Sequence, residues 1–377
     1  MKHSMTLFFV VIMSFFVVSC KQIHDNDVIG KDTSSPIATM GPDVQHVSKE
    51  ENMLIQFLKG EQYGQYGVYT NRLDSGQSDN VATGHEVLSE SAGLMMEFYA
   101  KKKDRNAFQQ EWELAKQVFD QETSFSYRYS PKLDKRYSVN AAVDDLRIVK
   151  SLYEGAKVFD DSRYLDEANK YASRFTAHNI KDSKLHDFYD EQYKMVNSYI
   201  TLCYIDLGTM LKLPLTEKES QKLQANMLAI IEGGYLSDGF PFYETRFNYD
   251  KDSYSSEDIN MVEGMLTVLS LTEVGKHKEA SVHYIKEHVK KGTLYGRYTK
   301  SGEPTTDIRS TALYALAAMI GKSVKDEELY KDSIDKMLQF QIIDTASPMY
   351  GGFGDPVSGQ AYSFDNLMAL NALALQQ

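Results

Sequence analysis

Ser89-Glu90-Ser91-Ala92-Gly93-Leu94-Met95-Met96 lies near the start of an expected helix, residues 84–101, that is apolar almost all round. A helix without a polar face is normally buried on both sides. Burial of a lone carboxylate in its first turns disfavours the charged form and raises the pKa. A carboxylic acid that stays protonated near neutral pH can serve as a general acid. We therefore expect Glu90 to be catalytic; the alternative is a first-turn glutamate that complements the helix dipole or caps the helix.

The rest of the chain predicts an all-α architecture around this segment. Short and long connections alternate between the expected helices, and helix pairs begin roughly every 50–60 residues. This repeat predicts an (α/α)6 barrel, a ring of six helical hairpins with short turns at one end and long loops on the active-site face. The best candidate for a strand is a short hairpin arm at 125–129. Apolar periodicity and cap signals place the helices at 47–59, 84–101, 104–120, 140–158, 161–176, 195–211, 217–231, 256–274, 276–290, 307–320, 325–339 and 363–376.

The N-terminus has the features of a lipoprotein signal peptide, which we assign to residues 1–20. A lysine precedes an apolar run, residues 6–18, that is too short for an ordinary membrane span. The run ends in Val17-Val18-Ser19-Cys20, which resembles the bacterial lipobox and predicts lipidation at Cys20. Residues 21–46 lack periodicity and predict a flexible tether, which leaves 47–377 as the catalytic domain. We expect an extracytoplasmic protein that its lipid anchors to the cell membrane; the alternative is an ordinary secretory signal with an incidental cysteine.

The composition limits the classes of partner. The formal charge of −12 at pH 7 argues against nucleic acid, because a phosphate backbone requires a basic face. A neutral or cationic polymer is a better match for this net negative charge. The chain has nine histidines but no His-Glu-x-x-His run, no cysteine pair for a metal and no phosphate-binding glycine motif. We expect a monomer without metal or cofactor, in which Cys203 is an inert core thiol.

The long loops are rich in tyrosine and phenylalanine. The chain has 25 Tyr and 18 Phe but one Trp. Aromatic rings with polar tips suit sugars, because the C–H face of a sugar stacks on the ring and its hydroxyls meet the phenol. We expect Tyr66, Tyr129, Tyr189 and Phe353 to bind substrate in this way. The alternative is that such rings only pack the loops.

Two further acidic segments fall at the same end of the expected barrel as Glu90. Asp144-Asp145 opens one expected helix, and Asp250 lies in the loop before another. One buried acid and one exposed carboxylate across a groove is the arrangement that glycoside hydrolysis uses. The alternatives are helix N-terminal charge for the aspartate pair and a solvated loop position for Asp250.

These segments resemble the motifs of glycoside hydrolase family 8, whose members are (α/α)6-barrel cellulases, chitosanases and xylanases. Ser89-Glu90 and Gly93-Leu94-Met95 are similar to the segment that carries the family's general acid. Asp144-Asp145-Leu146-Arg147-Ile148 resembles the family's Asp-x-Asp-Leu-x-Ile segment, and Phe247-Asn248-Tyr249-Asp250 resembles the loop with the general base. The resemblance spans roughly residues 50–377, although only these short segments are specific.

The sequence departs from the family pattern at two places. Ser91-Ala92 stands where the family has Gly-Gln after the acid. Val143 stands where the family has the first aspartate of its second motif, unless a one-residue gap shifts that aspartate onto Asp144. The second departure leaves the substrate-binding carboxylate open between Asp144 and Asp145.

The resemblance implies the chemistry of an inverting endo-glycoside hydrolase. Glu90 would protonate the leaving glycosidic oxygen, and Asp250 would activate a water on the opposite face of the sugar. Asp144 or Asp145 would hydrogen-bond the sugar at the cleavage point. We expect two further residues to line the site, Arg246 and Tyr249.

The lipobox and the scarcity of tryptophan resemble one branch of this family, the PssZ- and YdaJ-type proteins, which are secreted or lipid-anchored hydrolases linked to exopolysaccharide operons. The resemblance implies cleavage of a bacterial matrix polysaccharide, as in a biofilm. Two other functions stay open. One is a polysaccharide lyase or unsaturated-uronyl hydrolase on the same helical scaffold, and the other is a non-catalytic, membrane-tethered polysaccharide-binding protein.

Overall fold

The computed structural model describes residues 47–78 and 81–376. The predicted signal peptide, the lipidation site Cys20 and the predicted tether lie outside the described residues. Among the helices that are described, none is both long and apolar enough to cross a membrane.

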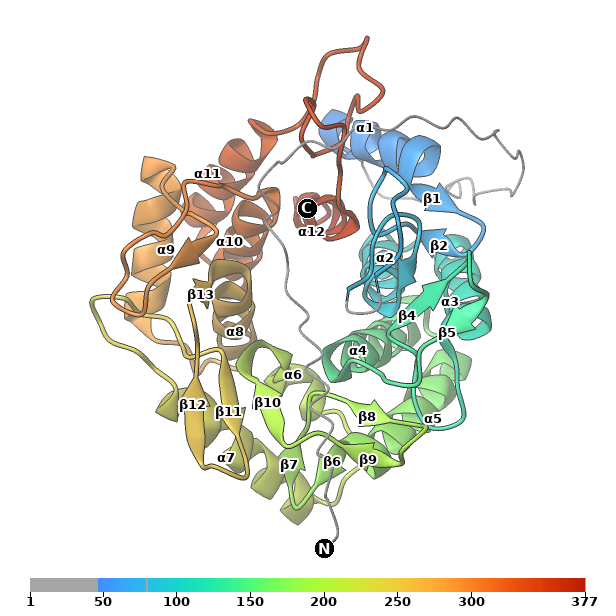
Figure 1. Cartoon of the computed structure of the whole chain (residues 1–377), viewed down its shortest axis with the longest axis vertical. Helices are drawn as coiled ribbons and strands as arrows, with labels where there is room; N and C mark the ends of the chain where they lie inside the picture. The colour runs from blue at the N-terminus through green and yellow to red at the C-terminus, as the bar shows by residue number, and fades with distance from the viewer. Residues whose placement is uncertain (1–46, 79–80, 377) are drawn as a thin grey trace, which may run out of the picture.

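Helices dominate the described part of the chain and form two concentric rings around a central axis (Figure 1). The α-helices are α1 (Lys49–Phe57), α2 (Ser89–Lys101), α3 (Arg105–Phe119), α4 (Ala142–Phe159), α5 (Ser162–Asn179), α6 (Leu207–Met210), α7 (Glu217–Gly233), α8 (Met261–Glu273), α9 (Glu279–Lys291), α10 (Thr311–Ser323), α11 (Glu327–Leu338) and α12 (Ser363–Leu373). A π-helical turn, η1 (Leu58–Gln62), extends α1, and a 3-10 turn, η2 (Leu202–Tyr204), precedes α6.

The inner ring closes on itself. Its members are α2, α4, α6, α8, α10 and α12, and each contacts the next in this order until α12 contacts α2. The outer helices α3, α5, α7 and α11 contact the inner helices that precede them, and α9 contacts α10 and α11. The first and last helices, α1 and α12, contact each other and complete the arrangement. The predicted (α/α)6 barrel is therefore confirmed.

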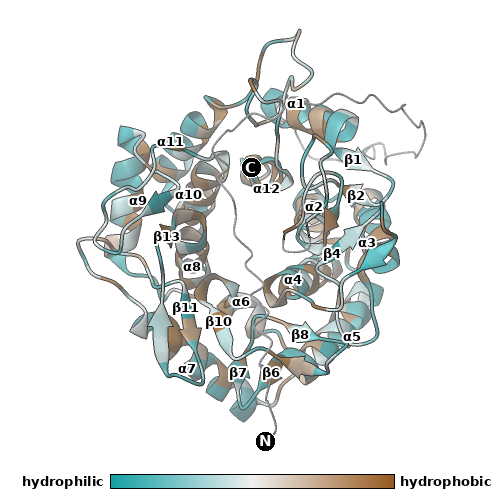
Figure 2. Ribbon diagram, viewed as in Figure 1, coloured by the Kyte–Doolittle hydropathy of each residue, from teal (hydrophilic) through white to brown (hydrophobic). Residues whose placement is uncertain are grey.

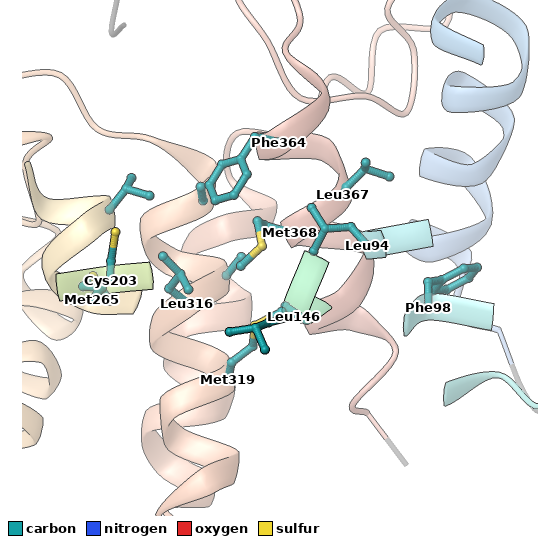
Figure 3. Close-up of a cluster of buried hydrophobic side chains, with 14 of the residues drawn as sticks. Leu94, Phe98, Leu146, Cys203, Met265, Leu316, Met319, Phe364, Leu367 and Met368 are labelled. Carbon is teal, nitrogen blue, oxygen red and sulfur yellow. The ribbon is translucent and has the colours of Figure 1, made fainter. Parts of the chain in front are cut away.

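Burial explains which helices are inner and which are outer. The inner helix α10 is buried at every position from Thr311 to Gly321, whereas the outer helices α3 and α5 bury a single stripe. Figure 2 accordingly shows brown, apolar ribbon toward the inner ring and teal, polar ribbon toward the outside. Figure 3 draws part of the shared core, to which α2, α4, α8, α10 and α12 contribute side chains such as Leu94, Leu146, Met265, Leu316 and Leu367.

The short strands lie in the long connections, which all meet the inner helices at their N-terminal ends. They form small antiparallel sheets, and the arm expected at 125–129 overlaps β4 only at its last two residues; β4 pairs with β3 and β5. The strands are β1 (Tyr63–Gly64), β2 (Gly67–Val68), β3 (Val87–Leu88), β4 (Arg128–Ser130), β5 (Lys135–Arg136), β6 (Ile180–Lys181), β7 (Lys184–Leu185), β8 (Tyr189–Asp190), β9 (Met195–Val196), β10 (Tyr199–Thr201), β11 (Arg246–Asn248), β12 (Ser253–Ser255), β13 (Ile259–Asn260) and β14 (Arg297–Tyr298).

One expected helix, 195–211, is wrong over most of its length. The chain there forms β9, β10 and η2, and only the short helix α6 remains. Tyr199, Ile200 and Thr201 pair with β11, so this segment is held as a strand by a partner that is distant in sequence. Two other expected helices begin later than predicted, at Ser89 and Met261, because the residues before them form β3 and β13.

Asn371 helps to close the inner ring and offers a test of closure. Its side-chain nitrogen donates to the carbonyl of Leu94 at 3.0 Å, and its side-chain oxygen accepts from Lys101 at 3.0 Å, which joins α12 to α2. We expect Asn371→Ala to lower the free energy of unfolding by about 1–3 kcal/mol, because buried groups lose their partners. The exposed Asn106 on α3 provides the control, and Asn106→Ala should change that free energy by less than about 0.5 kcal/mol. Equal effects of the two changes in urea denaturation would contradict this role.

Candidate active site

Glu90 is the second residue of α2 and lies at the long-loop end of the inner ring. Its side chain is 4% exposed, and Arg147 Nη1 lies 4.0 Å from its Oε2. Burial, followed by the negative charge of Asp144, raises the pKa of Glu90 to about 8, although Arg147 opposes this shift. The carboxyl group is therefore largely protonated at neutral pH, as the sequence predicted.

Asp144 shares this part of the site with Glu90. It is the third residue of α4, and its Oδ1 accepts a hydrogen bond of 2.7 Å from Arg147 Nη1. Burial raises the pKa of Asp144 to about 6, while the charge and hydrogen bond of Arg147 act in the opposite direction. Gly93 makes room for this arginine, because a Cβ at that position would lie 3.1 Å from Arg147 Cγ. The packing of α2 on α4 thus brings an acid that is mostly protonated at neutral pH beside a mostly ionised one.

Asp145 points away from Glu90 and holds the preceding loop. Its Oδ2 accepts hydrogen bonds from Asn140 Nδ2 at 3.0 Å and from the backbone N–H of Phe125 at 3.4 Å. Asn140 in turn accepts from the backbone N–H of Tyr189 at 2.7 Å. Of the two aspartates that the sequence left open, Asp144 is the one beside Glu90.

A second charged cluster lies farther along the ring. Asp187 accepts two hydrogen bonds from Thr201, at 2.5 Å from its backbone N–H and at 2.6 Å from its hydroxyl. Arg246, which pairs with Thr201 across β10 and β11, donates to the same hydroxyl at 3.3 Å. Burial raises the pKa of Asp187 to about 6, and Thr201 and Arg246 oppose this shift. Arg246, predicted to line the site, therefore lies beside Asp187 in this second cluster.

Glu263 belongs to this second cluster and is the third residue of α8. It is half-buried, and burial raises its pKa to about 7; Asp187 adds to this shift, and Arg246 and Arg297 oppose it. Tyr204 is in η2, which contacts both α4 and α8, and it is influenced by the charges of both clusters. Burial, and then the negative charges of Asp187, Asp144 and Glu263, raise the pKa of Tyr204.

Asp250 lies outside both clusters. It is exposed in the turn between β11 and β12, beyond the register pair of Asn248 with Tyr199. The other end of that hairpin, at Arg246, is the end that approaches the inner ring, and Figure 1 shows the turn at the periphery over α7. Tyr249 is held at this outer end, where its hydroxyl donates to the Leu185 carbonyl. The structure therefore does not bring Asp250 or Tyr249 next to Glu90.

The predicted aromatic binding residues differ in their exposure. Tyr66 is half-buried and packs edge-on against Tyr129, with ring centroids 5.0 Å apart. Tyr129, Tyr189 and Phe353 are buried, so their rings pack the loops and do not present a face to solvent. The alternative reading of these three residues, as loop packing, thus fits the structure better than a role as sugar platforms.

Sequence reasoning missed Glu263 and Asp187. Glu263 carries the signal that identified Glu90, since Met261-Val262-Glu263-Gly264-Met265 also places a lone acid in the first turn of an apolar helix. Asp187 had no such signal, because it lies in a loop between β7 and β8 and only its two bonds from Thr201 reveal its place.

Comparison with known proteins places the chain among glycoside hydrolases. No protein-family model matches it. It is 29% identical over 294 residues to YdaJ of Bacillus subtilis (strain 168), named as a candidate lipoprotein, which covers 76% of this chain and 78% of that protein. It is 30% identical to a solved structure described as a novel alpha-amylase from Clostridium perfringens, with a TM-score of 0.80 over 90% of this chain and 100% of that one.

More distant solved structures share the fold. PssZ from Listeria monocytogenes is 19% identical with a TM-score of 0.67, over 89% of this chain and 98% of that one. Endoglucanase Cel10 from Klebsiella pneumoniae, a family 8 glycosyl hydrolase, is 14% identical with a TM-score of 0.59, over 86% of this chain and 98% of that one. The predicted resemblance to family 8 and to PssZ- and YdaJ-type proteins is therefore confirmed.

The raised pKa of Glu90 has a consequence for stability. Its pKa is about 8 in the folded protein against 4.5 for the free side chain, so the folded state binds more protons between these pH values. The stability that Glu90 contributes is present below pH 4.5 and is lost as pH rises through about 8. Glutamine does not ionise, so we expect the Glu90→Gln variant to keep its stability as pH rises. The urea midpoint of the variant should therefore exceed that of the wild type by more at pH 8 than at pH 5. Glu279→Gln, at an exposed position, is the control. An equal gain in urea midpoint for Glu90→Gln at both pH values would contradict the prediction.

Proposed function

Because the chain belongs to the same family of glycoside hydrolases as the alpha-amylase from Clostridium perfringens, we propose that it hydrolyses glycosidic bonds within a polysaccharide by inversion, with Glu90 as the general acid. The observation that carries the proposal is the pairing of Glu90 with Asp144 and Arg147 at the loop end of the inner ring. A protonated carboxyl group there can donate its proton to the leaving oxygen as the bond breaks.

Asp144 and Arg147 prepare the sugar in this mechanism. The bond of 2.7 Å from Arg147 stabilises the ionised form of Asp144, which can then accept a hydrogen bond from a sugar hydroxyl. Hydrogen bonds of this kind strengthen as the sugar distorts toward the transition state. Arg147 also limits the negative charge near Glu90, because it neutralises Asp144.

A bacterial exopolysaccharide of the biofilm matrix is the substrate we favour. The lipobox at Cys20 and the similarity to YdaJ support a lipid-anchored protein outside the cytoplasm, where such polymers lie. The acidic balance of the chain favours a neutral or cationic polymer. The name of the Clostridium enzyme adds α-glucan as the second class to test. We further propose that the protein acts within the polymer and as a monomer.

Glu90→Gln tests the proposed acid. We expect it to fold normally and to lower hydrolysis by about 10²–10⁴-fold, because glutamine cannot protonate the leaving oxygen. The substrates are soluble starch, carboxymethylcellulose, xylan and a purified neutral biofilm polysaccharide, and the measurement is the appearance of new reducing ends. Glu279→Gln, an exposed change of the same kind, should keep the wild-type rate.

The products decide between the proposed function and its alternatives. Proton NMR of the first products should show the anomer opposite to that of the substrate. Products that retain the anomeric configuration of the substrate would contradict the mechanism. A Glu90→Gln variant that hydrolyses polymer at the wild-type rate would also contradict it. Ultraviolet absorbance from a new double bond would identify a lyase, and binding without any shortening of the polymer would identify a non-catalytic binding protein.

A further inference from the structure

A second glutamate lies on the inner helix opposite the helix of Glu90. The ring runs in the order α2, α4, α6, α8, α10, α12, so that α8 is the helix opposite α2, as Figure 1 shows. Glu263 is the third residue of α8 and Glu90 the second of α2, and both helices begin at the long-loop end. Among the described residues, neither carboxyl group has a hydrogen-bond partner.

The size of the ring suits a reaction between these two groups. Packed helices lie about 8–10 Å apart, so opposite members of a six-helix ring lie about 16–20 Å apart. Inversion requires the two carboxyl groups to lie about 6.5–9.5 Å apart, a separation that glutamate side chains extending into the ring from opposite helices would reach. That separation leaves room for a sugar and an attacking water.

The surroundings of Glu263 suit the activation of water. Glu263 lines a small cavity together with Cys203, Thr245 and Asn260, and the cavity has room for about one water molecule. Asp187 cannot take this role as easily, because both of its oxygens already accept hydrogen bonds from Thr201. The carboxylate oxygens of Glu263 are not committed in this way.

We propose that Glu263 is the general base of the hydrolysis, the role that the sequence assigns to Asp250; this inference rests on the proposed function. A water attacks the anomeric carbon and passes one proton to Glu263 as the bond to the leaving sugar breaks. The leaving oxygen takes the proton of Glu90. One water is consumed, two new hydroxyl ends form, and solvent exchange restores the starting protonation of both glutamates.

The electrostatics agree with this assignment. Burial raises the pKa of Glu263 to about 7, with Asp187 raising it further and Arg246 and Arg297 opposing. The pKa of Glu90 is about 8, so an ionised base and a protonated acid coexist best between about pH 7 and 8. The acidic limb of the rate profile should then belong to Glu263.

Glu263→Ala with sodium azide tests the proposal. We expect hydrolysis of the polymer that the wild type cuts best to fall about 10²–10⁴-fold, with the acidic limb of the pH profile lost. Azide should enter the space of the missing side chain, restore turnover and give a glycosyl azide of inverted configuration, which loss of a merely structural residue would not do. Glu279→Ala is the control and should match the wild type. Circular dichroism and urea midpoints establish that each variant is folded.

The outcomes separate this inference from the proposed function. A wild type that cuts none of the four polymers overturns the proposed function and the role of Glu263 with it. An active wild type with an equally active Glu263→Gln overturns the role of Glu263 alone. Azide rescue of Asp250→Ala in place of Glu263→Ala would return the role to Asp250. Should Glu263→Ala be unfolded, Glu263→Gln keeps the shape of the side chain, and its loss of the acidic limb supports the proposal.

Discussion

Closure of the inner ring is the constraint on which the rest of the structure depends. Each inner helix packs against two inner neighbours, and their apolar side chains form one shared core. The carboxyl groups in the first turns of these helices, at Glu90, Asp144 and Glu263, lose hydration in this packing. Burial is accordingly the largest cause of the raised pKa of Glu90, Asp144 and Glu263. The packing that stabilises the fold is thus also the main cause of the raised pKa values of these three acids.

The sequence predicted the ring because its helices carry strong and regular signals. A helix such as 311–323 is apolar at nearly every position, and the alternation of short and long connections gives the order of the hairpins. The failure at 195–211 has a physical reason. A short, apolar run that is buried on both sides does not distinguish a strand from a helix, and pairing with β11, distant in sequence, decides the outcome.

The site was predicted where local sequence determines the environment and was missed where tertiary contacts determine it. Glu90 stood out as a lone acid in an apolar helix, and Glu263 satisfies the same criterion. The direction of the β11–β12 hairpin, in contrast, cannot be read from a loop sequence, and it carries Asp250 away from the ring. The choice between neighbouring aspartates likewise needed the structure, because adjacent residues on a helix point in different directions.

The two sides of the ring use the same electrostatic arrangement. On one side Arg147 lies 2.7 Å from Asp144 but 4.0 Å from Glu90; on the other, Thr201 occupies both oxygens of Asp187. Each aspartate thereby keeps the partners that stabilise its charge, whereas burial and a negative neighbour raise the pKa of each nearby glutamate against the opposing charge of an arginine. The pKa values of the groups on each side are consequently pushed apart, to about 6 and about 8 on the first side and to about 6 and about 7 on the second. Separation of this kind assigns distinct protonation states to carboxyl groups that share one site, which acid–base chemistry between two glutamates requires.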